Sequence, residues 1–173
     1  MKASIILVLF LLSISPLSKG QNVKPTAAHP QSAGLYGILP AYLAVKDALV
    51  NSSADKANEK AAALQQIISS ADLTSLSAPD KAAFAKVKEK LVFDARHISE
   101  SKELSHQRDH FKTLSANLAT LAGTVKLADT PVYQDYCPMK KAVWLSNEKA
   151  IKNPYFGSQM LTCGKITKTF NQD

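Results

Sequence analysis

Hydrophobic residues recur at intervals of three and four between residues 35 and 125, the spacing that one face of an α-helix produces. Four segments share this pattern. Their apolar faces include Leu35, Ile38, Leu39, Tyr42, Leu43 and Leu49; Ala57, Ala61, Leu64, Ile68 and Ala71; Phe84, Val87, Leu91 and Ile98; and Leu104, Phe111, Leu114, Leu118, Leu121 and Val125. Short polar connections separate them, so the pattern predicts a mainly α fold in which four helices form an antiparallel bundle.

Local residues indicate where these helices begin and end. Pro40 falls inside the first segment, so the first helix either starts near it or is kinked there. Ser77-Ala78-Pro79-Asp80 is typical of a capped start for the third helix. The pattern weakens over residues 99–105, where we expect a break, and Gly123 with the turn at residues 129–131 ends the fourth helix.

The last part of the chain, residues 131–173, has a different character. Residues 132–136 and 166–170 are short, partly alternating segments that could pair as β-strands. Trp144 and an Asn-Pro turn lie between them, and both cysteines of the chain are in this part. We therefore expect a small C-terminal cap with short strands, joined to the helices in a single domain over residues 34–173.

The first twenty residues resemble a secretory signal peptide. Lys2 precedes an apolar run over residues 3–14, and a small, turn-prone segment ends at Gly20. The run is shorter than the roughly 18–20 residues that span a bilayer, so no membrane span is expected after cleavage. Residues 21–33 are predicted to be a flexible leader. We expect the mature protein in the periplasm or outside the cell.

Charge and motifs argue against two classes of function. The net charge is +7, but the basic residues are spread along the chain and form no cluster with interleaved aromatic residues. Nucleic-acid binding is therefore not expected. The chain has no glycine-rich phosphate loop, and neither a Ser/His/Asp set nor a pair of catalytic carboxylates can be defended. We do not expect an enzyme.

Sulfur-bearing residues form two short motifs in the predicted cap: Cys137-Pro138-Met139 and Met160-Leu161-Thr162-Cys163. Thiolates and thioethers are soft donors, which select Cu(I) or similar ions over Mg²⁺ or Ca²⁺. If the two loops meet, Cys137, Met139, Met160 and Cys163 form a soft-metal site.

The alternative for the same two cysteines is a disulfide, the commonest state of a cysteine pair in an exported protein. A Cys137–Cys163 bond would add roughly 3 kcal/mol of stability in the chain-entropy model. A disulfide does not need a methionine near each cysteine, however, and Met139 and Met160 are the only methionines besides the initiator. Both interpretations therefore stay open.

Three histidines are possible additional metal ligands. His106 and His110 are four residues apart and share one helical face, which is a ligand spacing. This face is offset from the stripe that contains Phe111, so we expect both side chains to be solvated. His97 lies beside Ile98 in the third apolar segment and is expected at the edge of the core.

Several longer strings in the C-terminal part resemble a known family. They are VYQDYCPM at 132–139, WLS at 144–146, IKNPYFG at 151–157 and MLTCG at 160–164. With them the chain resembles a bacterial domain of unknown function, which occurs in exported proteins, mainly of Bacteroidetes, and at the C-terminus of CusB-type heavy-metal efflux periplasmic adaptor subunits. The resemblance covers roughly residues 35–170 and implies a periplasmic helical bundle associated with copper or silver handling, without assigned catalysis.

These observations lead to two expectations about function. The first is a periplasmic protein that binds or handles a soft metal ion such as Cu(I) and is associated with heavy-metal efflux. The second is a disulfide-stapled helical module that docks on an efflux adaptor or another envelope protein.

Overall fold

The structure is a computed structural model that describes residues 34–171. In this range it contains four α-helices: α1 (Ile38–Val50), α2 (Ala54–Ser69), α3 (Ala78–Glu100) and α4 (Leu104–Ala122). The strands β1 (Val132–Cys137), β2 (Ala142–Ser146) and β3 (Lys165–Phe170) follow, with a short 3₁₀ turn, η1 (Gly157–Gln159), before β3. The predicted signal peptide and leader, residues 1–33, lie outside the described residues.

The four predicted helices are confirmed, together with two details of their ends. The Ser77 hydroxyl oxygen accepts a hydrogen bond from the Asp80 backbone N–H at 3.2 Å, so Ser77 caps α3 as expected. Pro40 lies in the first turn of α1, where a backbone N–H would have no partner within the helix; the helix therefore starts near it. The expected break corresponds to residues 101–103, between α3 and α4.

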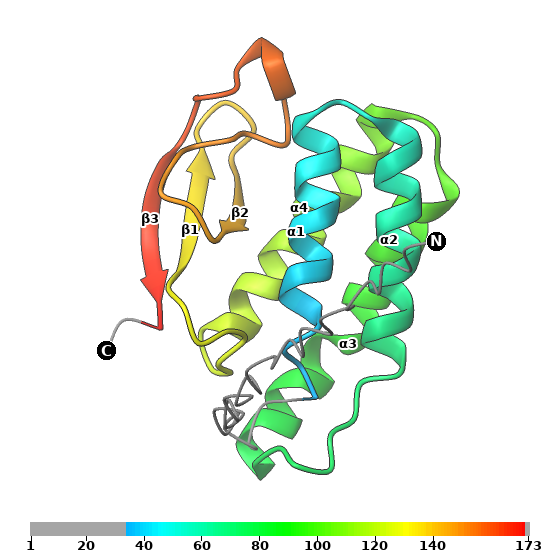
Figure 1. The fold of residues 1–173 in the computed structure, drawn as a ribbon, viewed down its shortest axis with the longest axis vertical. Helices are drawn as coiled ribbons and strands as arrows, with labels where there is room; N and C mark the ends of the chain where they lie inside the picture. The colour runs from blue at the N-terminus through cyan, green and yellow to red at the C-terminus, as the bar shows by residue number, and fades with distance from the viewer. Residues whose placement is uncertain (1–33, 172–173) are drawn as a thin grey trace, which may run out of the picture.

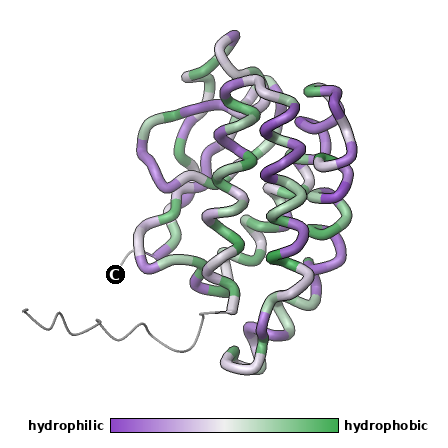
Figure 2. Tube along the Cα trace, turned by 45° about the vertical axis from the view of Figure 1, so that its right-hand side comes forward, coloured by the Kyte–Doolittle hydropathy of each residue, from purple (hydrophilic) through white to green (hydrophobic). Residues whose placement is uncertain are grey.

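Each helix packs against the next one in the chain, and the small sheet lies to one side, beside α1 and α4 (Figure 1). Strand β2 contacts α4 directly. Green hydrophobic and purple hydrophilic stretches alternate along the helices (Figure 2), as expected where one face of each helix is buried. In the part of the chain that the structure describes, no helix combines the length and the apolar character that crossing a membrane requires.

The sheet is antiparallel, with the strand order β2-β1-β3. The predicted pairing of residues 132–136 with residues 166–170 is confirmed, since β1 pairs with β3. Strand β2 was not predicted. Four of its five residues are buried, so its sequence lacks the alternation of apolar and polar positions that marks a half-exposed strand.

Aromatic side chains fill the space between the sheet and the helices. Trp144 is fully buried, and it contacts Tyr155 edge-on with 6.0 Å between ring centroids. The Tyr42 ring of α1 stacks on the Phe111 ring of α4 at 5.0 Å. The sheet and the helices therefore share one hydrophobic core.

Asp135 brings a carboxyl group into this core. Its side chain is fully buried, and neither carboxyl oxygen has a hydrogen-bond partner among the protein groups. Burial raises the pKa of Asp135 to about 7, and the nearby ammonium group of Lys46 counteracts part of the rise. The folded protein therefore favours the protonated form of this side chain below about pH 7.

Because the pKa of Asp135 is higher in the folded state than in the unfolded chain, its contribution to stability is fully present below pH 4 and is lost as the pH rises toward 7. The change Asp135→Asn removes this loss. Urea denaturation measures the free energy of unfolding of both proteins. As the pH rises from 5 to 8, this free energy should increase in the variant relative to the parent by on the order of 2 kcal/mol. Glu89→Gln, at an exposed acidic position, is the control; an equal gain in both variants would refute this assignment.

Candidate metal centre

The two cysteines lie at neighbouring points of the cap. Cys137 is the last residue of β1, and Cys163 lies two residues before the start of β3. Tyr136 is the register partner of Lys165, so the antiparallel pairing brings the two cysteine-bearing ends together. Cys137 is fully buried and Cys163 is half-buried. The segments that carry the two cysteines therefore lie side by side.

Gly164 permits this close approach. A Cβ atom on Gly164 would lie 2.7 Å from the Trp144 ring and 3.2 Å from the carbonyl oxygen of Tyr136. Both distances are shorter than an ordinary carbon contact, so only glycine lets the chain beside Cys163 pass this close to the chain beside Cys137. Trp144, which comes from β2, lies directly against this crossing.

The electrostatics of the pair follow from their proximity. Partial burial raises the pKa of Cys163, and the charge of Cys137 and a hydrogen bond with it raise that pKa further. The backbone N–H of Lys140 donates to the Cys137 sulfur at 3.4 Å. Both cysteines are free thiols in the structure, and their proximity is compatible both with a shared metal ion and with a disulfide.

The two methionines differ in their positions. Met160 is half-buried, and its carbonyl oxygen accepts a hydrogen bond from the Cys163 backbone N–H at 3.0 Å, so one turn carries both sulfur-bearing residues. Met139 follows β1 and is 66% exposed. To bind the same ion as the buried Cys137, Met139 would have to turn its side chain inward.

Asn153 and Arg108 position the loop that carries Met160 and Cys163. The Asn153 side-chain amide donates to the Cys163 carbonyl oxygen at 2.6 Å. The Arg108 guanidinium of α4 donates to the carbonyl oxygens of Pro154 at 2.9 Å and Leu49 at 3.2 Å. The same group donates to the Ser52 hydroxyl at 3.0 Å. Partial burial lowers the pKa of Arg108.

For Asn153 the sequence indicated only a turn, and for Arg108 it gave no specific role. Their shared function in holding this loop depends on contacts between distant segments, which no local pattern reveals. The Asn-Pro pair was the one available signal, because it marks a turn whose shape must be held.

The three histidines come together with one another and not with the cysteines. Possible ligand atoms of His97, His106 and His110 all lie within 4.8 Å of one another, in a group that contains neither cysteine. As expected, His106 and His110 share a face of α4. His106 is exposed, as expected, and His97 is half-buried. The expectation that His110 is solvated was wrong, because its side chain is half-buried and contacts Asp94. Their contacts place them between α3 and α4 rather than in the cap.

We expect Arg108→Met to destabilise the protein by about 1.5–3 kcal/mol, because it leaves half-buried carbonyl groups without their charged donor. It should also speed the reaction of Cys163 with a disulfide reagent several-fold, since the loop loses its anchor. Lys152→Met is the matched control: Lys152 lies in the same loop, but its exposed pair with Glu148 is worth little. Equal thiol reaction rates in the two variants would show that Arg108 does not hold the loop.

Comparison with known proteins gives one match. Residues 38–130 match a family described as "Protein of unknown function (DUF3347)". The matched range contains the four helices and the three histidines, and it ends before β1. No curated protein and no solved structure matches the chain.

Proposed function

We propose that this chain, which belongs to the DUF3347 family, is an exported protein that binds a soft monovalent metal ion of the Cu(I) or Ag(I) class between Cys137 and Cys163. The observation that supports this most directly is the convergence of two thiols that come from separate segments of the cap. Two thiolates facing one another satisfy an ion that prefers few, soft ligands.

The neighbouring sulfur and nitrogen groups suit the same ion. Met160 shares a turn with Cys163, and its thioether can act as a third ligand. The backbone N–H of Lys140 donates to the Cys137 sulfur at 3.4 Å and so adds a polar contact at this ligand. Met139 completes the set when its exposed side chain turns toward the pair.

In this proposal the four helices form an antiparallel bundle that serves as a scaffold, and the cap holds the ion. The protein would buffer the ion in the periplasm or pass it to a heavy-metal efflux system. The link to efflux rests on the resemblance to the C-terminal part of CusB-type adaptor subunits. An adaptor of this kind, or another envelope protein, is the partner that this role implies.

The competing function is a disulfide-stapled module that docks on such a partner without binding metal. The proximity of the same two thiols supports it equally well. A thiol count separates the two. We expect two reactive thiols in the denatured protein after isolation from the periplasm under anaerobic conditions. A count of zero, with no change in native mass when Cu(I) is added, would instead establish the stapled module.

Metal binding can be measured directly by titrating the reduced protein with Cu(I) against a competing chelator. We expect one tightly bound ion, lost when Cys137 and Cys163 are both changed to serine. Met160→Leu should weaken binding more than Met139→Leu, because Met160 lies beside Cys163 whereas Met139 is 66% exposed.

The two methionine variants form a matched pair, since the substitution is the same and only the position differs. A thermal melt of each variant verifies that it is folded. If the double serine variant is folded and retains Cu(I) as tightly as the parent, the cap thiols are not the site and the proposal fails.

A further inference from the structure

A second group of metal-binding side chains lies on the helices. His97 is in the last turn of α3, and His106 and His110 are one turn apart on α4. Since only residues 101–103 connect the two helices, the end of α3 lies against the beginning of α4. This packing brings possible ligand atoms of all three imidazoles within 4.8 Å of one another.

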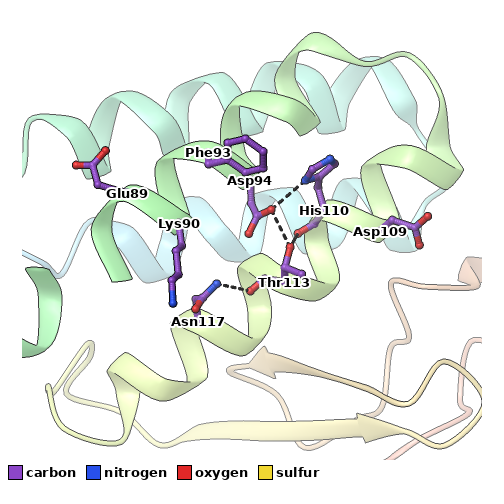
Figure 3. Close-up of a pocket in the computed structure, with 8 residues that line it drawn as sticks. All are labelled: Glu89, Lys90, Phe93, Asp94, Asp109, His110, Thr113 and Asn117. Atoms are coloured by element: carbon purple, nitrogen blue, oxygen red, sulfur yellow. Dashed lines mark hydrogen bonds and ion pairs between the residues drawn. The ribbon is translucent and has the colours of Figure 1, made fainter. Parts of the chain in front are cut away.

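A buried carboxylate orients one of the three rings. The Nδ1 atom of His110 lies 2.9 Å from an Asp94 carboxylate oxygen, and the Thr113 hydroxyl donates to the same oxygen at 2.7 Å (Figure 3). Asp94 is only 4% exposed. A carboxylate that accepts from Nδ1 leaves the Nε2 lone pair free, and this is how proteins commonly orient a metal-binding histidine.

The three rings form a compact cluster with one aromatic wall. The His97 and His110 rings are stacked with 4.4 Å between centroids, and the His106 ring is 4.7 Å from that of His110. The Phe93 ring lies 4.3 Å from His97, although Phe93 is 48% exposed. Phe93 therefore shields one side of the cluster from water, while the exposed His106 leaves another side accessible.

We propose that His97, His106 and His110 form a three-imidazole centre for a divalent ion, with Cu²⁺ bound most tightly and Zn²⁺ also accepted. Neutral imidazoles suit these borderline ions, and copper stands above zinc in the general order of affinities. The centre is distinct from the cap thiols, because neither cysteine belongs to the cluster. The inference therefore goes beyond the proposed function and does not depend on it.

Three protein ligands leave a coordination position open on a zinc- or copper-type ion. A groove of about 580 Å³ adjoins the cluster and is lined by Phe93, Asp94, His110 and Thr113, among other residues (Figure 3). Water or a small anion can reach the ion through this groove. The centre is thus built for an exchangeable ion rather than for a closed structural one.

The proposal is tested by adding Cu²⁺ to the variant in which Cys137 and Cys163 are serine. The thiols must be absent, because free thiols reduce Cu²⁺ to Cu⁺ while they are oxidised to a disulfide. We expect one bound Cu²⁺ whose electron paramagnetic resonance spectrum shows couplings to imidazole nitrogens. In this background, His97→Ala and His106→Ala should each lower the affinity at least about tenfold.

Two further variants sharpen the result. His29→Ala removes a histidine outside the described residues and should leave the affinity unchanged, which makes it the matched control. Asp94 positions the His110 ring, and Asp94→Asn retains the shape of its side chain but removes the charge. We expect the affinity for Cu²⁺ to fall about tenfold, with one ion still bound.

If the serine background does not fold, the parent protein can be titrated with Zn²⁺, which thiols do not reduce. The imidazole resonances of the three clustered histidines should then shift, whereas those of His29 should not. Unchanged resonances at all three, or Cu²⁺ binding that survives the loss of His97 and His106 together, would overturn the proposal. The Cu(I) titration depends on the cysteines, so each of the two sites can fail without the other.

Discussion

The buried hydroxyl group of Tyr42 holds the helices and the sheet in one arrangement. It shares a hydrogen bond of 2.7 Å with the Ser115 hydroxyl of α4 and accepts the Leu145 backbone N–H of β2 at 3.1 Å. Burial raises the pKa of Tyr42 well above its usual value, so the hydroxyl keeps its proton. A buried polar group that loses its hydrogen-bond partner costs about 1–3 kcal/mol. Because any shift of α1, α4 or β2 would break one of these bonds, the three elements keep one relative position.

Helix α4 connects both candidate metal centres to this arrangement. Arg108 donates to the loop that carries Cys163, and Asp109 pairs with Lys140, whose backbone N–H donates to Cys137. The next residue, His110, contacts Asp94 of α3 instead. One short stretch of α4 therefore supports a thiol pair and a cluster of imidazoles. Soft and borderline ions differ in their preferred donors. Two such sites can therefore bind Cu(I) and Cu²⁺ separately within one domain.

The parts of the fold that depend on local pattern were predictable, and those that depend on distant contacts were not. The helical period and the Ser77 cap predicted the helices, but β2 has a buried pattern that resembles no half-exposed strand. Spacing placed His106 and His110 on one face. The position of His97 beside these two histidines and the contact of Asp94 with His110 depend on how α3 packs on α4. Residue spacing does not encode this packing. Similarly, the two short motifs located the cysteines, yet nothing in them distinguished the half-buried Met160 from the exposed Met139.

The unequal burial of the two thiols has a consequence for how an ion would enter the proposed cap site. Cys137 is inaccessible from solvent, whereas Cys163 is half-buried and follows Met160 in one turn. An ion must therefore meet Cys163 or one of the two methionines before it reaches Cys137, and it must leave in the reverse order. A partner that removes the ion would have to compete first for the accessible sulfur atoms. This requirement favours exchange by stepwise ligand replacement over release of a free ion into solvent.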